Sequence, residues 1–111
     1  MNNTYEIWET RYKNKGNSGN GSYNQLANFK AEIINSFIKN NNITKIIELG
    51  SGDGNQCNLF DIENYLGLDI SPTIIERCQN MFKNKKNFKF DIYNKNYVNT
   101  NKFDLSLSLD V

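Results

Sequence analysis

The sequence predicts an α/β fold built on a four-stranded parallel sheet with the strand order 3-2-1-4. Short, nearly continuous apolar runs alternate with segments of helical periodicity, which is typical of parallel strands covered by helices. Right-handed crossovers between such strands leave few other topologies. With 111 residues, of which 38% are apolar and 23% charged, the chain is expected to form one domain. We expect an N-terminal arm and lid loop over residues 1–21 and a core over residues 22–111.

The first part of the chain combines an amphipathic arm, a glycine-rich loop and a helix. Residues 5–12 carry aromatic and apolar side chains and predict a helical turn or arm. The GNSGNG run at residues 16–21 predicts a flexible loop, since glycine and small polar residues do not hold a fixed helix or strand. Ser22 and Gln25 form a capping box ahead of an apolar repeat of helical spacing, which predicts a helix over residues 22–40.

The rest of the chain alternates strands and helices. A buried strand ends at a glycine cluster, and Ser71 and Pro72 supply an N-cap and a first-turn proline for the helix with the clearest apolar stripe. The connection before the last strand is polar, and a regular helix is not expected there. The expected strands cover residues 45–49, 64–69, 88–92 and 103–109, with a short helix over residues 55–60 and a longer one that begins at residue 72.

Composition excludes several classes of site. The chain has no histidine, and Cys57 and Cys78 lie far apart, so Ser-His-Asp triads, Cys-His pairs and Cys/His zinc sites are excluded and no metal is expected. Both thiols are expected to be small buried groups. Nucleic acid binding is not expected. The formal net charge of +1 gives little electrostatic attraction to nucleic acid, and the lysine cluster at residues 83–89 has no aromatic side chains on which bases could stack. Without a membrane span or a signal peptide pattern, a cytoplasmic protein is expected.

A glycine loop and two acids mark the carboxyl edge of the predicted sheet. The turn after the first strand reads ELGSGDG, in which alternate glycines let the backbone turn sharply and offer amide groups to a carboxylate. Asn55 departs from the G-x-G-x-x-G pattern of dinucleotide folds. Asp69 ends the second strand, where it can accept both ribose hydroxyls, and Asp91 closes the third, where it can accept an adenine amino group. Taken singly, these features can be a tight turn and helix caps, but their joint spacing favours a nucleoside ligand where the strand order reverses.

These segments resemble the class I S-adenosylmethionine-dependent methyltransferases. The resemblance rests on IIELGSGDGNQ at residues 46–56, YLGLDIS at 65–71, FKFDIY at 88–93 and FDLSLSLDV at 103–111. Residues 8–37 also resemble the N-terminal part of a group of small methyltransferases, in which W-x-x-R-Y and a glycine-rich loop precede GSY-x-x-LA-x-F-K-A-E. The resemblance implies a minimal Rossmann-like methyltransferase fold with S-adenosylmethionine as cofactor and S-adenosylhomocysteine as product. The cofactor-binding residues that it implies are Tyr12, Glu48, Gly50, Gly52, Gly54, Gln56, Asp69, Ile70, Asp91, Ile92 and Leu109.

The resemblance also implies where parts of the cofactor lie. Glu48 and the three glycines would line the methionine moiety, Asp69 the ribose, and Asp91 with Ile92 the adenine ring. The backbone near Leu109 would meet the amino group, and Tyr12 with the loop after it would close over the methionine end.

The implied activity is methylation of a small-molecule acceptor at oxygen, sulfur or nitrogen. Asp110 is the first candidate for a catalytic base, although a role limited to binding cofactor or solvent is favoured over it. The chain lacks the [DN]-P-P-[YFW] motif that holds a planar amide or base nitrogen, which argues against methylation of DNA adenine or of glutamine. It also ends at Val111 with the fourth strand, whereas the family's sheet has seven, so the alternative is a non-catalytic S-adenosylmethionine-binding or regulatory module. A bare fourth strand predicts a homodimer through this edge. The 21 asparagines and the short chain suggest a reduced methyltransferase from an AT-rich genome, such as that of a large DNA virus, and hence the host cytoplasm. A piece of a longer protein fits these features equally.

Overall fold

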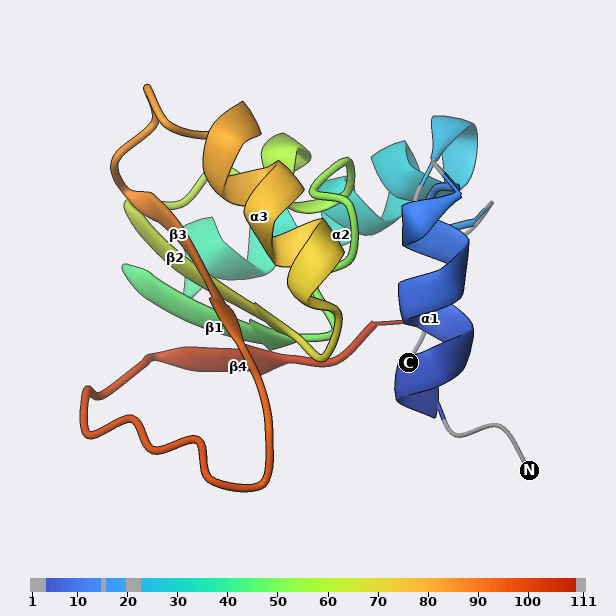
Figure 1. The fold of residues 1–111 in the computed structure, drawn as a ribbon. Coiled ribbons are helices and arrows are strands. Elements are labelled where there is room, and N and C mark those ends of the chain that lie inside the picture. The colour runs from blue at the N-terminus through green and yellow to red at the C-terminus, as the bar shows by residue number, and fades with distance from the viewer. Residues whose placement is uncertain (1–3, 15, 20–22, 110–111) are drawn as a thin grey trace.

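The computed structural model describes residues 4–14, 16–19 and 23–109 (Figure 1). Its centre is a sheet of four parallel strands in the order β3-β2-β1-β4, which confirms the predicted topology. The strands are β1 (Lys45–Leu49), β2 (Asn64–Asp69), β3 (Phe88–Ile92) and β4 (Leu105–Leu107). The helices are α1 (Thr4–Lys13), α2 (Asn24–Asn40), the 3-10 helix η2 (Cys57–Leu59) and α3 (Pro72–Met81).

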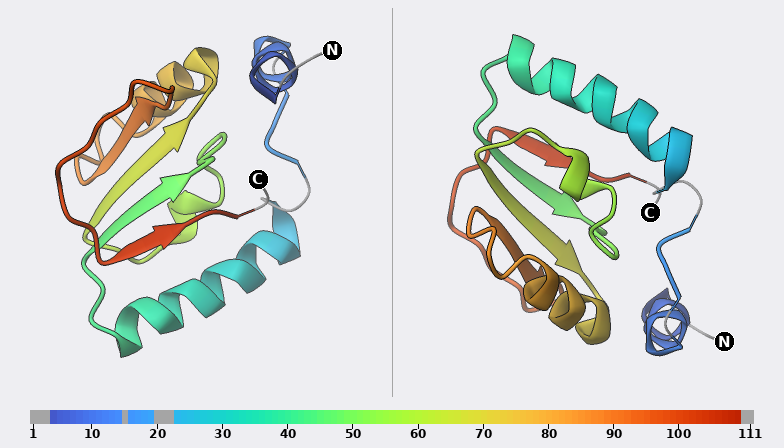
Figure 2. Two further views of the ribbon diagram at one scale, coloured as in Figure 1. Left: turned by 90° about the horizontal axis from the view of Figure 1, so that it is seen from below. Right: turned by 90° about the horizontal axis from the view of Figure 1, so that it is seen from above.

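The helices that follow the arm pack on one side of the sheet. Figure 2 shows α2 alongside β4, and α3 packs over β2 and β3. The loop of residues 93–104 extends from the opposite side before it returns to β4 (Figure 1). α1 stands beyond the carboxyl ends of the strands, where it contacts α3. The arm therefore lies at the edge of the sheet where the sequence predicts a ligand.

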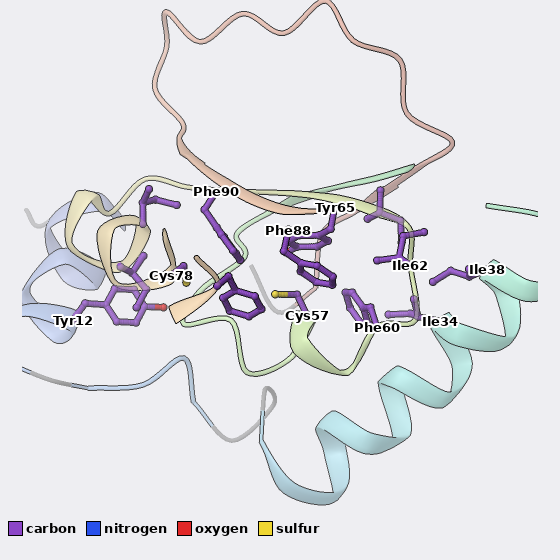
Figure 3. Packing of buried hydrophobic residues seen from close by; sticks show 14 residues of the cluster. Tyr12, Ile34, Ile38, Cys57, Phe60, Ile62, Tyr65, Cys78, Phe88 and Phe90 are labelled. Carbon is purple, nitrogen blue, oxygen red and sulfur yellow. The ribbon is translucent and has the colours of Figure 1, made fainter. Parts of the chain in front are cut away.

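The core between the sheet and the helices is rich in aromatic rings (Figure 3). Tyr65 stacks on Phe88 with ring centroids 5.0 Å apart, and Phe82 contacts Phe90 at 4.9 Å. Side chains at alternate strand positions point to one face, so Tyr65, Phe88 and Phe90 all reach the helices. This packing anchors β2 and β3, whose carboxyl ends carry the two predicted nucleoside-binding acids.

Three element boundaries differ from the sequence prediction. α2 begins at Asn24 after Tyr23, without a side-chain cap, and the predicted capping residue Ser22 lies outside the described residues. The helix expected over residues 55–60 is only the single turn η2, because the backbone is already extended at Phe60. β4 is shorter than expected, since it pairs with β1 alone, opposite residues 46–48.

α2 is apolar on two sides. The buried side consists of Ala27, Ala31, Ile34 and Ile38. The large side chains of a second side are 47 to 59% exposed, and they are Leu26, Phe29, Ile33 and Phe37. Helical spacing predicts the helix but does not tell which of its apolar side chains face the core. In the part of the chain that the structure describes, no helix combines the length and apolar character needed to cross a membrane.

Candidate functional site

The glycine loop turns sharply at the carboxyl end of β1. Gly50, Gly52 and Gly54 have φ angles of 81°, 63° and 86°, which side chains with a Cβ rarely adopt. The amide groups of Gly50 and Ser51 donate to the carbonyl of Leu68 at 2.7 and 3.0 Å. The loop is therefore held against β2, with its backbone close to the end of that strand.

Asp69 joins the glycine loop to the start of α3. Its carboxylate accepts hydrogen bonds from the amide groups of Gly52 at 3.0 Å and Ser71 at 3.1 Å. Burial raises the pKa of Asp69 above its usual value, and the Ser71 and Gly52 amides oppose this shift. An ionised carboxylate accepts about four hydrogen bonds, so these two amides leave capacity for ligand hydroxyl groups. Asp69 lies where the sequence predicts the ribose acid.

Glu48 and Gln56 are embedded in the protein. Glu48 is 2% exposed and accepts a hydrogen bond from the Tyr65 hydroxyl at 2.6 Å. Gln56 is 4% exposed, and its amide donates to the carbonyl of Ala27 at 3.0 Å, so it braces the glycine loop against α2. The structure therefore shows a supporting contact for each side chain, and their role toward a cofactor stays a prediction.

The end of β3 lies next to the end of β2. In the parallel register Asp91 is opposite Leu68 and Ile92 is opposite Asp69. The Asp91 carboxylate is exposed and accepts the amide of Ile92 at 2.9 Å, and Ile92 itself is 37% exposed. Ile70 is half-buried beside them. An accessible acid and an accessible apolar side chain are thus adjacent, as the predicted adenine site requires.

A strap of residues 16–19, which has no regular secondary structure, lies on the glycine loop, and residues 20 and 21 of the predicted loop lie outside the described residues. The Ser18 amide donates to the Asp53 carboxylate at 2.9 Å, and the Asp53 amide donates to the Ser18 hydroxyl at 2.7 Å. The hydroxyl groups of Tyr12 and Ser18 are 2.8 Å apart, and either can donate. A Cβ at Gly52 would overlap the Ser18 side chain. Reciprocal hydrogen bonds and close packing therefore define the position of the strap.

Asp53 is the central acceptor of this contact, and it is not among the site residues predicted from the sequence. It is 5% exposed and also accepts the Tyr23 hydroxyl at 2.5 Å and the Asn55 amide at 3.1 Å. In the sequence, its position inside the glycine loop is the feature that could have identified Asp53 as a candidate. Its partners Ser18 and Tyr23 are distant in sequence, so only the folded chain identifies them.

The arm is fixed to α3 by polar contacts. The Arg77 guanidinium donates to the carbonyl groups of Tyr12 at 2.9 Å and Gly16 at 3.2 Å. The buried Glu9 accepts the Ser71 hydroxyl at 2.5 Å and the Thr73 amide at 3.2 Å. Although burial raises the pKa of Glu9, the hydrogen bonds from Ser71 and Thr73 outweigh it and the pKa lies below its usual value. Burial also raises the pKa of Tyr12 to about 12, so its hydroxyl stays protonated at neutral pH.

The two cysteines support the glycine loop from the core. Both are free and fully buried, which confirms the prediction. The Cys57 thiol donates to the Gly54 carbonyl at 3.4 Å, and the Cys78 thiol donates to the Gly52 carbonyl at 3.3 Å. Burial raises the pKa of Cys78 to about 12, so the thiol remains protonated and is not a nucleophile.

Two predicted residues belong to the end of the chain. Leu109 is half-buried and packs against the core, and Asp110 lies outside the described residues.

Over residues 4–14, 16–19 and 23–109, no three His, Cys, Asp or Glu side chains gather as metal ligands. The site therefore presents positive-φ glycines, a buried carboxylate that bridges two loops and an exposed carboxylate on the next strand.

Comparisons with known proteins support the fold. No family profile and no curated protein sequence matches this chain. A Staphylococcus aureus protein provisionally named as a caffeoyl-CoA O-methyltransferase has a TM-score of 0.62 and 19% identity, over 95% of this chain and 53% of its own. CalS10, an amino pentose methyltransferase from Micromonospora echinaspora solved with S-adenosylmethionine, has a TM-score of 0.61 and 14% identity, over 98% and 44%.

An S-adenosylmethionine-dependent methyltransferase from Clostridium acetobutylicum has a TM-score of 0.59 and 18% identity, over 93% of this chain and 41% of its own. These likenesses establish the Rossmann-like methyltransferase fold. The chain spans 41 to 53% of the length of these three proteins.

Proposed function

We propose that this chain is a class I methyltransferase that binds S-adenosylmethionine at the carboxyl edge of its sheet. The observation that carries the proposal is the link from the Asp69 carboxylate to the Gly52 amide, which couples the predicted ribose acid to the glycine loop. The named activities and bound ligands of CalS10 and of CalH, which was solved with S-adenosylhomocysteine, support this choice among ligands of the fold. The free, buried thiols suit the reducing cytoplasm that we propose as its location.

The residues present fit this cofactor. Under the proposal, the methionine end of the cofactor lies against the glycine loop, because glycine allows close approach of the backbone. Asp69 accepts the ribose hydroxyls with its remaining acceptor capacity. Asp91 accepts the adenine amino group, and Ile92 contacts the ring. Ile70 adds an apolar contact between these two acids, and Gln56 holds the loop in place through α2.

The arm supplies the cover of the site. Tyr12 and the strap contact Gly52 and Asp53, so under the proposal they lie next to the methionine end of the cofactor. Glu48 stabilises the floor of this region through Tyr65. The backbone at Leu109 is proposed to meet the cofactor's amino group. A cover of this kind excludes water and fixes the direction from which an acceptor approaches.

The chemistry requires alignment more than acid–base groups from the protein. When bound, S-adenosylmethionine supplies an activated methyl group on its sulfonium. The chain's residues hold the donor so that an acceptor can meet that carbon in line, which needs no histidine. For an acceptor hydroxyl that must lose a proton, we propose Asp110 as the base. Thiols, amines and acidic phenols need positioning alone, and we propose small molecules of these kinds as the acceptors.

Two measurements test the proposal. Isothermal titration calorimetry should detect binding of both S-adenosylmethionine and S-adenosylhomocysteine, and absence of binding at ~1 mM of either would reject it. A panel of phenols, thiols and amines should then release S-adenosylhomocysteine with at least one acceptor. Binding without turnover on any acceptor would instead support a non-catalytic cofactor-binding or regulatory module.

A further inference from the structure

Glu9 of α1 is a buried carboxylate that the proposed function does not use. It is 8% exposed, and α1 stands beyond the carboxyl ends of the strands, next to α3 (Figure 1). One oxygen of Glu9 accepts the Ser71 hydroxyl at 2.5 Å and the Thr73 amide at 3.2 Å, across 62 and 64 positions of the sequence. Both donors lie at the start of α3, shortly after Asp69. The arm therefore holds this segment through a side chain.

Glu9 completes the hydrogen bonding of the first turn of α3. The proline at the start of this helix has no amide hydrogen. The amides of Ile74 and Ile75 donate to the hydroxyl and carbonyl oxygens of Ser71, both at 3.2 Å. The Thr73 amide and the Ser71 hydroxyl hydrogen are the remaining donors, and Glu9 accepts both. Without Glu9, two donors in a largely buried segment would lose their acceptor, which destabilises its position.

The charge of Glu9 suits this place. Burial raises the pKa of Glu9, but the hydrogen bonds from Ser71 and Thr73 outweigh this effect and lower it, so the side chain is ionised at neutral pH. A negative charge at the N-terminus of a helix interacts favourably with the helix dipole. The contact between α1 and α3 is therefore stabilised by charge as well as by hydrogen bonds.

Ser71 connects Glu9 to Asp69. Its hydroxyl donates to Glu9, and its backbone amide donates to the Asp69 carboxylate at 3.1 Å. The other oxygen of Asp69 accepts the Gly52 amide at 3.0 Å. A row of hydrogen bonds thus runs from the arm, through the start of α3, to the glycine loop. Because Ser71 is completely buried, its hydroxyl cannot exchange Glu9 for water unless this segment moves.

We infer that Glu9 is a positioning residue for cofactor binding: it fixes Ser71 and thereby the orientation of Asp69, so that docking of the arm and binding of the nucleoside strengthen each other. The inference rests on the proposed function and adds a coupling to it. An acceptor that is oriented before the ligand arrives binds more tightly, since less ordering accompanies binding. The coupling also acts in reverse, because a ligand that prefers the docked arm must stabilise that docking by the same factor.

The cofactor affinity of Glu9 variants tests the inference. In isothermal titration calorimetry, Glu9→Ala should bind S-adenosylhomocysteine about fivefold or more weakly than the original protein, the lower end of typical coupling between sites. Glu9→Gln should restore most of the affinity, because its amide oxygen still accepts both hydrogen bonds. Glu76→Ala is the matched control, since Glu76 is exposed on α3, and its affinity should equal that of the original protein.

Two results would overturn the inference alone: equal affinity of Glu9→Ala and the original protein, or a Glu9→Gln variant as weak as Glu9→Ala. If the original protein does not bind S-adenosylhomocysteine, the proposed function and the inference are rejected together. Far-ultraviolet circular dichroism verifies the fold of each variant. If Glu9→Ala does not fold, Glu9→Asp replaces it, because this side chain keeps the charge but is one methylene shorter, and the same loss of affinity is expected.

Hydrogen–deuterium exchange tests the reverse direction of the coupling. Saturating S-adenosylhomocysteine should slow exchange of the α1 amides in the original protein, and this protection should be smaller in Glu9→Ala at equal saturation. A helix cap without a role in positioning would affect the free and the bound protein equally. Equal protection of α1 by the ligand in both proteins would therefore overturn the inference.

Discussion

Asp69 combines burial with several hydrogen-bond donors. Water is excluded from its carboxylate, which raises its pKa, while the backbone amides of Ser71 and Gly52 stabilise the ionised form. These amides come from the segments that follow β1 and β2, so the side chain sets the distance between the two loops. A ligand hydroxyl would meet an acceptor that is already oriented.

Replacement of this carboxylate measures its contribution to ligand binding. Asp69→Ala should weaken S-adenosylmethionine affinity by ~1 to 3 kcal/mol, because a charged acceptor for the ribose is lost. Isothermal titration calorimetry gives the difference, with Asp61→Ala as the control because Asp61 is exposed and precedes β2. Equal affinities of the two variants would place the ribose elsewhere.

The strap and the glycine loop form one hydrogen-bonded unit at the scale of elements. Asp53 accepts the Ser18 amide and the Tyr23 hydroxyl, and Arg77 holds the backbone at Tyr12 and Gly16. The arm, the start of α2 and α3 thus meet around one loop. The position of the strap therefore depends on Asp53 and on Arg77 of α3.

Removal of the Asp53 carboxylate should loosen the strap. Hydrogen bonds to a charged group contribute about 1.5 to 3 kcal/mol, so Asp53→Ala should speed exchange of the Ser18 amide at least tenfold. Hydrogen–deuterium exchange with peptide resolution measures this change. Tyr23→Phe removes a single bond and should give a smaller effect, whereas equal protection in all three proteins would show that the strap is held by other contacts.

β4 is attached to the sheet by Asp104. Its carboxylate accepts the amide and hydroxyl of Thr44, both at 2.8 Å, and the amide of Lys45 at 3.1 Å. The hydrogen bonds from Thr44, followed by that from Lys45, hold the pKa of Asp104 below its usual value of 3.8. A lowered pKa in the folded state means that the stabilisation is complete above pH 3.8 and declines as the pH falls through the folded pKa.

Asp104→Asn should therefore lower the free energy of unfolding at neutral pH and make a smaller difference in acid. Urea denaturation between about pH 2.5 and pH 7 gives the free energy of unfolding of the Asp104→Asn variant and of the original protein. Asp61→Asn serves as the control for loss of an exposed carboxylate. A difference between Asp104→Asn and the original protein that stays constant across this range would show that ionisation of Asp104 does not stabilise the fold.

At the scale of the whole molecule, ligand binding and folding are coupled. A ligand that binds only the folded chain stabilises it by about 2.7 kcal/mol at 100 times its Kd. For a domain of this size, S-adenosylmethionine should then raise the melting temperature by about 10 °C or more, as calorimetry can measure. NAD at the same concentration should give no shift, because Asn55 departs from the dinucleotide pattern. An equal shift with NAD would favour a dinucleotide site.

The layout of the molecule places every proposed ligand contact at one edge. The carboxyl ends of β1, β2 and β3 carry the glycine loop and the two acids, and α1 stands beyond them (Figure 1).

The strand order, the glycine loop and the two acids at the strand ends could be predicted from the sequence alone. These features are local, because period-2 and period-3.6 patterns, glycine and helix caps act over a few residues, and right-handed crossovers restrict how the resulting units join. Asp69 and Asp91 could be identified for this reason, since each follows a readable strand.

Three features became visible in the folded chain: the apolar side of α2 that faces the core, the position of the residue 16–19 strap, and the hydrogen bond from the strap to Asp53. The strap contains glycine and has no regular pattern, and its hydrogen bonds join residues 35 positions apart. Likewise, Leu26 and Ile34 satisfy the same helical period, yet one is exposed and the other buried. Such choices depend on long-range packing and on buried polar groups finding partners, which the local pattern of a sequence does not encode.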